Sequence, residues 1–321
     1  IHVTRLCDKQ CFNCTQGSNL KPLENGNKHI QSFITVEQFE QAVISLKSYF
    51  GVVGVFGGNP ALHPQFTDIC MVLRDHIPKE RCGLWCNNPI SPVKAQAMVD
   101  AFNPAVSNLN VHKNEKAYGM FRKYWPQARP FGLKNDSRHS PVFTAMKDLG
   151  VGEEKRWELV ANCDINQHWS AMVGVFRGEL RGWFCEIAGA QSILHQADPN
   201  YPDTGIPIVC ETCNGTGEEY VDIGEDDGYD TCLSCHGKQW WEHGMGYYWH
   251  QVKKHCHECG VPLRGRGDLA CDGTTEQVSE THRSIYNPKD STRQVEVVTT
   301  LEQLQAQSLQ LMTDYLGNAK R

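Results

Sequence analysis

Short apolar stretches alternate with amphipathic ones along the first 150 residues. The segment 52–56 is apolar and β-branched, as is typical of a buried strand, and it follows an amphipathic stretch at residues 35–49. Thr35 is the expected N-cap of that helix, and Gln38 completes a capping box. The pattern predicts further strands at residues 1–6, 83–86, 106–112 and 130–133. It predicts further helices at residues 64–75, 91–102, 114–123 and 139–148.

This alternation is typical of βα units around a parallel sheet, so the sequence predicts an α/β fold. The carboxyl ends of parallel strands meet at one edge, where α/β barrels carry their chemistry. We therefore expect the polar residues that end the third and fourth strands to lie at the same edge. These residues are Asn87, Asn88, Asn108, Asn110 and His112.

The second half of the chain has a different pattern. Two strand-like runs at 169–176 and 180–184 are separated by a tight turn at 177–179, which predicts a β-hairpin. Near the end, residues 300–316 place apolar side chains at helical spacing and predict an amphipathic helix without chemistry of its own. We expect this half to form a small, cysteine-rich α+β domain.

Composition limits the classes of protein. With 321 residues, 40% of them hydrophobic, the chain can bury a full core, and we expect two domains at about 1–160 and 161–321. No apolar run is long enough to cross a membrane, and no secretory signal pattern is present. The net charge of −6 gives no overall attraction to nucleic acid, although it does not exclude a local basic patch.

The chain has 15 cysteines, many of them in C-x2-C pairs, which favours metal sites in a reducing cytoplasm over a disulfide framework. Cys7, Cys11 and Cys14 are spaced C-x3-C-x2-C. Three thiolates this close can hold three irons of a 4Fe-4S cluster and leave the fourth iron open. Zinc sites usually close four ligands, and no fourth cysteine or histidine lies within reach here.

Phe12 stands between the last two of these cysteines, in the sequence CFNC. With it, the triplet resembles the signature of the radical S-adenosylmethionine (SAM) superfamily. The resemblance implies a partial (βα)6 TIM-like barrel over residues 1–160. It also implies that the cysteines are catalytic: the open iron binds SAM, and an electron, supplied by a flavodoxin- or ferredoxin-type donor, cleaves SAM to a 5′-deoxyadenosyl radical. Phe12 would pack against the adenine.

A second landmark is the turn Gly57, Gly58, Asn59 and Pro60 after the strand 52–56. It is similar to the GGEP turn of the superfamily, so the resemblance assigns these residues to the amino group of SAM. Asn59 replaces the usual glutamate, and its amide oxygen can accept a hydrogen bond from an ammonium group without charge assistance. The alternative is a plain strand–turn–helix connection with glycines chosen for positive φ.

The resemblance implies further cofactor contacts along the mouth of the barrel. It assigns three polar residues to SAM, the last two to its ribose or carboxylate: Asn88, Ser107 and Asn110. Ordinary strand-end polarity is the alternative. His112 could transfer a proton or touch substrate, but a hydrogen-bonded surface histidine is favoured. Arg138 and His139 could meet an anionic group, and Ser137 could cap a helix.

Cysteines on either side of the predicted hairpin indicate a second metal site. Cys163 precedes the hairpin and Cys185 follows it. The pair resembles the SPASM or twitch extension of radical SAM enzymes, in which later cysteines complete an auxiliary cluster. Here these would be Cys256 and Cys259, with Cys271 as a spare. Four thiolates suit either 4Fe-4S or zinc, and the resemblance slightly favours the cluster.

Four more cysteines lie in an acidic insert at about 205–240, with the spacing C-x2-C-x18-C-x2-C: Cys210, Cys213, Cys232 and Cys235. The spacing favours zinc, and the insert resembles the zinc modules of DnaJ-type cochaperones. A structural staple is favoured over a substrate- or partner-binding role. The aromatic run at 239–250 could stack on a nucleobase or fix the insert to the barrel, and packing is favoured.

Together these features predict a radical SAM enzyme that abstracts hydrogen from a substrate. Modification or isomerisation of a nucleoside or DNA base is favoured, although the acidic charge counts against it. The alternative is a peptide-modifying enzyme, for which we would expect a leader-binding domain of about 80–90 residues ahead of the cysteines. The third interpretation is a non-catalytic iron–sulfur and zinc interaction module, against which the turn at 57–60 argues.

Overall fold

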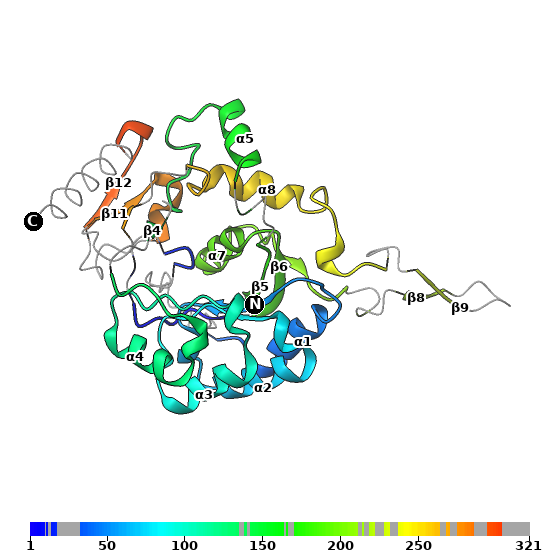
Figure 1. Cartoon of the computed structure of the whole chain (residues 1–321). Helices are drawn as coiled ribbons and strands as arrows, with labels where there is room; N and C mark the ends of the chain where they lie inside the picture. Colours follow the sequence, from blue (N-terminus) through cyan, green and yellow to red (C-terminus); the bar gives the residue numbers. More distant parts are fainter. Residues whose placement is uncertain are drawn as a thin grey trace, which may run out of the picture.

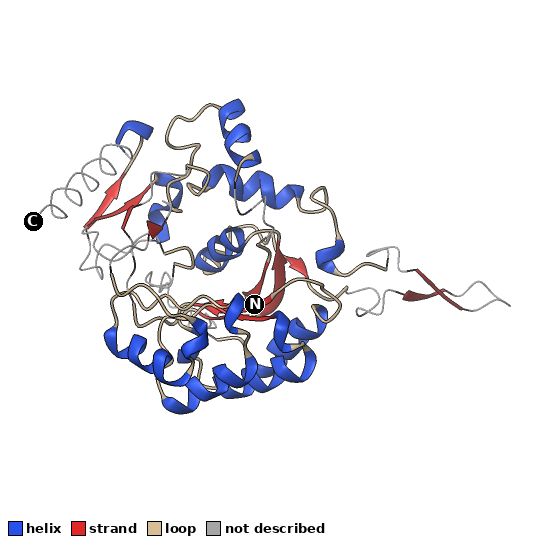
Figure 2. Cartoon of the chain, in the orientation of Figure 1, coloured by secondary structure: helices blue, strands red, loops and turns tan. Residues whose placement is uncertain are grey.

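The computed structural model places helices and strands along most of the chain (Figures 1 and 2). It describes residues 1–9, 11, 14–17, 33–134, 138–139, 142–163, 165, 170–210, 214, 218–221, 228–231, 237–263, 268–269, 275–285 and 294–303. Within these residues the fold is mixed α/β with several small sheets, which confirms the predicted mixture of helices and strands.

A small parallel sheet lies at the centre of the first half. It contains β1 (His2–Thr4), β2 (Val53–Gly57) and β3 (Cys82–Leu84), in that order. In β2 the side chains alternate, so that Val53 and Val55 are buried while Gly54 and Phe56 lie on the opposite face and are only partly buried.

Two isolated parallel bridges continue this sheet. Trp85 pairs with Asn108, and Asn110 pairs with Phe131. The strands predicted at 106–112 and 130–133 are therefore reduced to single bridges. His112 has a φ of 45°, in the left-handed region, which ends the extended conformation of the first of them.

Four helices lie along one side of this sheet, at the bottom of Figure 1. They are α1 (Val36–Ser45), α2 (Phe66–His76), α3 (Pro92–Ala101) and α4 (Glu115–Tyr124). The predicted capping box is present, because the Thr35 side chain accepts from the N–H of Gln38, and the Gln38 side chain accepts from the N–H of Thr35. These four predictions are confirmed to within a few residues.

The helix predicted at 139–148 is wrong. Arg138 and His139 form the short strand β4, which pairs antiparallel with β10 (Asp268–Leu269); Ser137 and the side chains of β4 lie outside the described part. The physical reason is a competing set of long-range hydrogen bonds. The N–H of Ala145 donates to Ser279 Oγ at 2.8 Å, and other main-chain groups of residues 142–147 bond to residues 257–279.

The predicted hairpin is confirmed. β5 (Met172–Phe176) and β6 (Glu179–Trp183) pair antiparallel, and β7 (Ile206–Pro207) adds to β6. The turn residues Arg177 and Gly178 have φ values of 51° and 89°, as a two-residue hairpin turn requires.

The remaining elements complete the described part of the chain. The helices are α5 (Glu153–Ala161), α7 (Glu186–His195) and α8 (Trp249–His255). The other strands are β8 (Glu218–Val221), β9 (Gly228–Thr231), β11 (Thr275–Val278) and β12 (Gln294–Val297). Short 3₁₀ helices are η1 (Pro60–Leu62), η2 (Lys79–Arg81), η3 (Pro104–Val106), η4 (Pro126–Ala128), η5 (Trp240–Glu242), η6 (Cys256–Glu258) and η7 (Glu280–Ile285).

One connected set of buried apolar side chains runs through both halves, from Phe39 and Phe66 beside the first sheet to Trp183 and Tyr248 in the second half. Among the described helices, none has the length and apolar character needed to cross a bilayer. Of the helix predicted at 300–316, residues 301–303 are helical, Thr300 directly precedes them, and residues 304–316 lie outside the described part.

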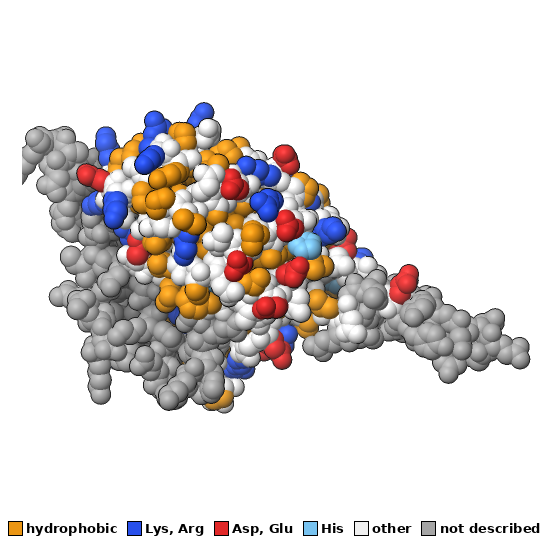
Figure 3. Space-filling model, turned by 90° about the horizontal axis from the view of Figure 1, so that it is seen from below, with side chains coloured by type: hydrophobic (Ala, Val, Ile, Leu, Met, Phe, Trp, Pro, Cys, Tyr) orange, Lys and Arg blue, Asp and Glu red, His pale blue; other side chains and the backbone are white. Residues whose placement is uncertain are grey.

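The side of the molecule formed by α1–α4 carries charges of both signs between scattered apolar side chains (Figure 3). Ile44, Met71 and Val93 are the exposed apolar residues of α1, α2 and α3. Scattered apolar residues of this kind are ordinary for a protein surface.

Buried histidines lie around α7. The ring of His195 stacks on Tyr201 with centroids 4.5 Å apart, and His282 lies 5.9 Å away. Burial, together with the neighbouring His282 and Lys254, lowers the pKa of His195 from 6.5 to about 4.

We predict that His195 contributes to the loss of stability in acid. The unfolded chain binds a proton at this residue near pH 6.5 and the folded chain only near pH 4, so stability falls as pH drops through this window, by up to about 3 kcal/mol. His195→Phe keeps an aromatic ring against Tyr201 and removes the titrating group, so that stability no longer depends on pH through this residue. Urea unfolding between about pH 7 and pH 5 should show a shallower decline for the variant, and equal slopes would contradict the prediction.

Candidate functional site

The end of β1 lies directly against the glycine turn that follows β2. The N–H of Gly58 donates to the carbonyl of Thr4 at 2.8 Å, and the next N–H, of Asn59, donates to the carbonyl of Leu6 at 2.7 Å. A Cβ atom on Gly58 would lie 2.2 Å from the Leu6 carbonyl oxygen. One on Gly57, whose φ is +151°, would lie 2.3 Å from that of Thr4. This approach therefore requires glycine at both positions.

Asn59 is fully buried and links the turn by hydrogen bonds to the segment that begins at Cys7 and contains Cys11 and Cys14, here called the cysteine segment. Its Oδ1 accepts from the N–H of Ala61 at 3.3 Å and from the thiol of Cys86 at 3.1 Å. Its Nδ2 donates to Asp8 at 3.2 Å and to the carbonyl of Asn88 at 3.0 Å, and Asn88 Nδ2 donates to the other oxygen of Asp8 at 2.9 Å. Both ends of the Asn59 amide are thus engaged inside the protein, so this geometry does not support the expected contact with a SAM ammonium.

The cysteine segment lies over the carboxyl ends of β1–β3. Asn87 Nδ2 donates to Cys7 Sγ at 3.3 Å. Cys11 is buried, while Cys7 and Cys14 are half-buried. Burial raises the pKa of Cys7 to about 11, and the neighbouring Cys14 thiol adds to the rise. Phe12 lies outside the described residues.

Ser107 and Asn110 lie on either side of the bridge at residue 108. The hydroxyl of Ser107 accepts from the N–H of Leu84 at 3.1 Å and donates to the carbonyl of Asn103 at 2.7 Å. It therefore fixes the start of the extended stretch that contains Asn108 and Asn110. Asn110 Oδ1 accepts from the N–H of His112 at 3.2 Å, at the carboxyl end. Of these two SAM candidates, Asn110 lies at the expected edge.

The structure brings Cys163, Cys185, Cys256 and Cys259 together, although up to 96 residues separate them in the sequence. All four are buried and line one small, largely apolar cavity of about 20 Å³. Cys163 follows α5, Cys185 caps the start of α7, and the other two lie at either end of η6.

The thiols of this cysteine cavity lie in a low-dielectric environment. Burial raises the pKa of Cys185 and Cys259 well above the usual range, and Cys256 and Cys163 add to the rise at Cys259. In the described part of the chain, no three His, Cys, Asp or Glu side chains have an arrangement that could hold a metal ion. Cys271, the predicted spare, lies outside that part.

Only one cysteine of the predicted zinc insert is described. Cys210 is half-buried, and the hairpin of β8 and β9 comes between the two cysteine pairs in the sequence. The remaining three, Cys213, Cys232 and Cys235, lie outside the described residues.

Two tryptophans of the aromatic run after the insert contact α1. Trp240 Nε1 donates to Ser45 Oγ at 3.2 Å, and Trp241 Nε1 donates to the Ser45 carbonyl at 2.9 Å. The ring of Trp241 also meets Tyr49 edge-on at 5.2 Å, and the buried Tyr248 donates its hydroxyl to the carbonyl of Trp240. These contacts agree with the favoured packing role.

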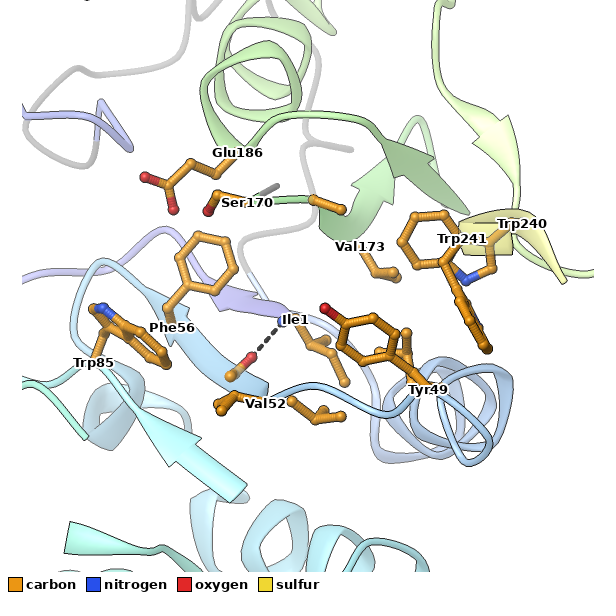
Figure 4. Close-up of a pocket in the computed structure, with 14 residues that line it drawn as sticks. Ile1, Tyr49, Val52, Phe56, Trp85, Ser170, Val173, Glu186, Trp240 and Trp241 are labelled. Carbon is orange, nitrogen blue, oxygen red and sulfur yellow. Dashed lines mark hydrogen bonds between the residues drawn. The ribbon is translucent and has the colours of Figure 1, made fainter. Parts of the chain in front are cut away.

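A larger cavity, which the sequence did not reveal, lies between the start of α7 and the face of the sheet that carries Gly54 and Phe56 (Figure 4). Its volume of about 420 Å³ lies within the usual range for small-molecule sites. The alternation in β2 could have assigned Gly54 and Phe56 to one face, but no local pattern links them to Glu186 or Trp241. The lining residues are Ile1, Leu46, Tyr49, Val52, Val53, Gly54, Phe56, Trp85, Ser170, Ala171, Val173, Glu186, Trp240 and Trp241.

No protein-family model matches this chain, and no curated protein matches it closely enough to count as a relative.

We predict that Gly58→Ala destabilises the protein by about 1–3 kcal/mol, because the new methyl group would overlap the Leu6 carbonyl and push the end of β1 away. Gly119→Ala is the matched control: it lies in α4 with nothing within 4 Å of its added Cβ, and should be neutral or stabilising by up to about 1 kcal/mol. Urea unfolding measures both. Equal effects of the two substitutions would show that the close approach is not required.

Proposed function

We propose that the chain is a radical SAM enzyme that binds a 4Fe-4S cluster through Cys7, Cys11 and Cys14. The strongest support is the position of the cysteine segment, which lies over the carboxyl edge of a parallel sheet and is hydrogen-bonded to residues after β2 and β3. When bound, the cluster would supply the electron that cleaves SAM to a 5′-deoxyadenosyl radical, with a cytoplasmic flavodoxin- or ferredoxin-type protein as donor.

We also propose that residues 1–160 form the partial (βα)6 barrel of this superfamily. In its support, β1, β2 and β3 are parallel and in chain order, and the bridges at 108–110 and 131 continue the same order. The connecting helices lie on one side of this sheet, as in α/β barrels (Figure 1).

In this proposal the protein binds and orients SAM. Gly57 and Gly58 let the turn approach the end of β1 closely, and we assign this turn to the amino group of SAM. Asn110 is the polar side chain of its segment placed for the ribose or carboxylate, and Phe12 would contact the adenine. Asn59 acts indirectly, because its amide holds the turn against Asp8.

We assign the cysteine cavity to an auxiliary metal centre. Four buried thiols from three separate segments line it, and thiolates suit 4Fe-4S or zinc. We favour the cluster, whose binding would draw these thiols into a ligating arrangement that they do not have in this structure. The insert with Cys210 would hold zinc as a structural staple. The favoured substrate is a nucleoside or DNA base, because the large cavity combines aromatic rings with a few polar groups.

The test of the proposal is anaerobic SAM cleavage. The reconstituted protein should convert SAM to 5′-deoxyadenosine in the presence of dithionite, and Cys11→Ala should reduce the yield at least about a hundredfold, because the cluster loses one of three ligands. Cys70→Ala is the control, since Cys70 is buried in α2 and belongs to neither proposed cluster. Absence of 5′-deoxyadenosine from an iron-loaded protein, both with and without candidate nucleosides, would reject the proposal.

Metal analysis tests the auxiliary centre separately. If the cysteine cavity holds a second 4Fe-4S cluster, the wild type should bind about eight irons and Cys163→Ala about four. Loss of zinc with unchanged iron in this variant would instead assign the cavity to zinc.

A further inference from the structure

The large cavity has a distinct polar corner. Figure 4 shows Glu186 and Ser170 above the ring of Phe56, with Trp85 beside it, while Tyr49, Trp240 and Trp241 lie at the other end. The two ends therefore differ in chemistry: one is aromatic with a carboxylate, and the other is aromatic with indole N–H groups already bonded to α1.

Trp85 forms an aromatic wall because glycines lie beneath it. An added Cβ on Gly54 would lie 2.5 Å from its ring, and one on Gly83 would lie 2.8 Å from it. The indole thus rests against the sheet, and 43% of the residue is still exposed. An exposed indole ring that packs on glycine backbone offers a surface on which a flat ring can stack.

The carboxylate of Glu186 is held in place at this corner. Ser170 hydrogen-bonds to the carboxylate, and the Ser170 carbonyl accepts from the main-chain N–H of Glu186 at 2.8 Å. Glu186 is the first residue of α7, where the helix dipole favours a negative charge. Burial raises the pKa of this carboxyl, while Ser170 and the amino group of Ile1 act in the opposite direction. Among the described residues, no lysine or arginine forms an ion pair with it, so its oxygens can accept hydrogen bonds from a ligand.

This corner also lies close to the cysteine segment. Trp85 is two residues before Asn87, whose amide donates to Cys7, and two residues of extended chain span about 7 Å. Phe56 immediately precedes Gly57 and Gly58, which contact the end of β1. A ring bound between these walls would therefore lie beside the proposed SAM site.

We propose that this corner binds a guanine-type base, stacked on Trp85 and Phe56, with Glu186 accepting hydrogen bonds from its N1–H and N2–H groups. Among the common nucleobases, guanine alone presents two adjacent N–H donors on its Watson–Crick edge, which matches the two oxygens of one carboxylate. Hydrogen bonds to a charged acceptor are stronger than those between neutral groups. The substrate class deepens the proposed function and rests on it for the reaction, while binding itself needs no SAM.

The experiment is titration calorimetry of guanosine into the anaerobically purified full chain without SAM. Guanosine should bind, inosine, which lacks the N2 amino group, should bind about tenfold more weakly, and adenosine more weakly still. Glu186→Gln should weaken guanosine binding at least about tenfold. Glu158→Gln is the matched control, because this glutamate is exposed on α5, outside the cavity, and should leave binding unchanged.

Two further measurements keep the inference open to rejection. Trp85→Leu should also weaken binding if the base stacks there, and urea unfolding shows whether each variant is folded. Equal binding of guanosine and adenosine, unchanged binding in Glu186→Gln, or tighter binding of agmatine, a guanidinium cation, would overturn the assignment. If the protein binds guanosine but never cleaves SAM, the base-binding site is supported and the radical SAM function is rejected. If it cleaves SAM but does not bind guanosine, only the proposed ligand class is rejected.

Discussion

The close backbone contact between the end of β1 and the Gly57–Gly58 turn determines where the residues that follow β1 lie. The carbonyl oxygens of Thr4 and Leu6 occupy the space where side chains on these glycines would lie. A backbone–backbone contact of this kind cannot adjust by changing rotamers. The direction in which the chain leaves β1 towards Cys7 is therefore set by the sheet itself, and the Asn59–Asp8 hydrogen bond extends the same constraint into the cysteine segment.

The start of α7 connects the two cavities of the protein. Cys185 caps this helix and lines the cysteine cavity, and the next residue, Glu186, lines the large one. Cys185 has extended backbone angles and Glu186 is the first helical residue, so their side chains can serve different cavities. A metal bound by Cys185 would hold the first turn of α7 and with it the carboxylate of Glu186. The proposed auxiliary centre would then position Glu186 in addition to any part in electron transfer.

Local signals made much of the first half predictable. The helices α1, α3 and α4 begin where Thr35, Ser91 and Asn114 accept from N–H groups of the first turn, and such caps are visible in sequence. The predicted helix at 139–148 failed because its amide groups bond to residues more than a hundred positions away, for which no local pattern exists. The large cavity was missed for the same reason, since its walls come from positions as distant as Leu46 and Trp241. The four cysteines of the smaller cavity were grouped by their resemblance to a known arrangement, not by periodicity.

Burial makes free thiolates unfavourable in both cysteine sets. Burial raises the pKa of Cys7 to about 11 and that of Cys185 well above its usual range, so without a cation these thiols stay protonated at neutral pH. A metal must displace those protons, and in return its charge compensates thiolates that water does not reach. Burial makes an isolated thiolate unfavourable. Metal binding by these thiolates would therefore depend strongly on the folded state. Binding at either set would then be coupled to the close backbone contact at one site and to the start of α7 at the other, which are the parts of the fold that position the cysteines.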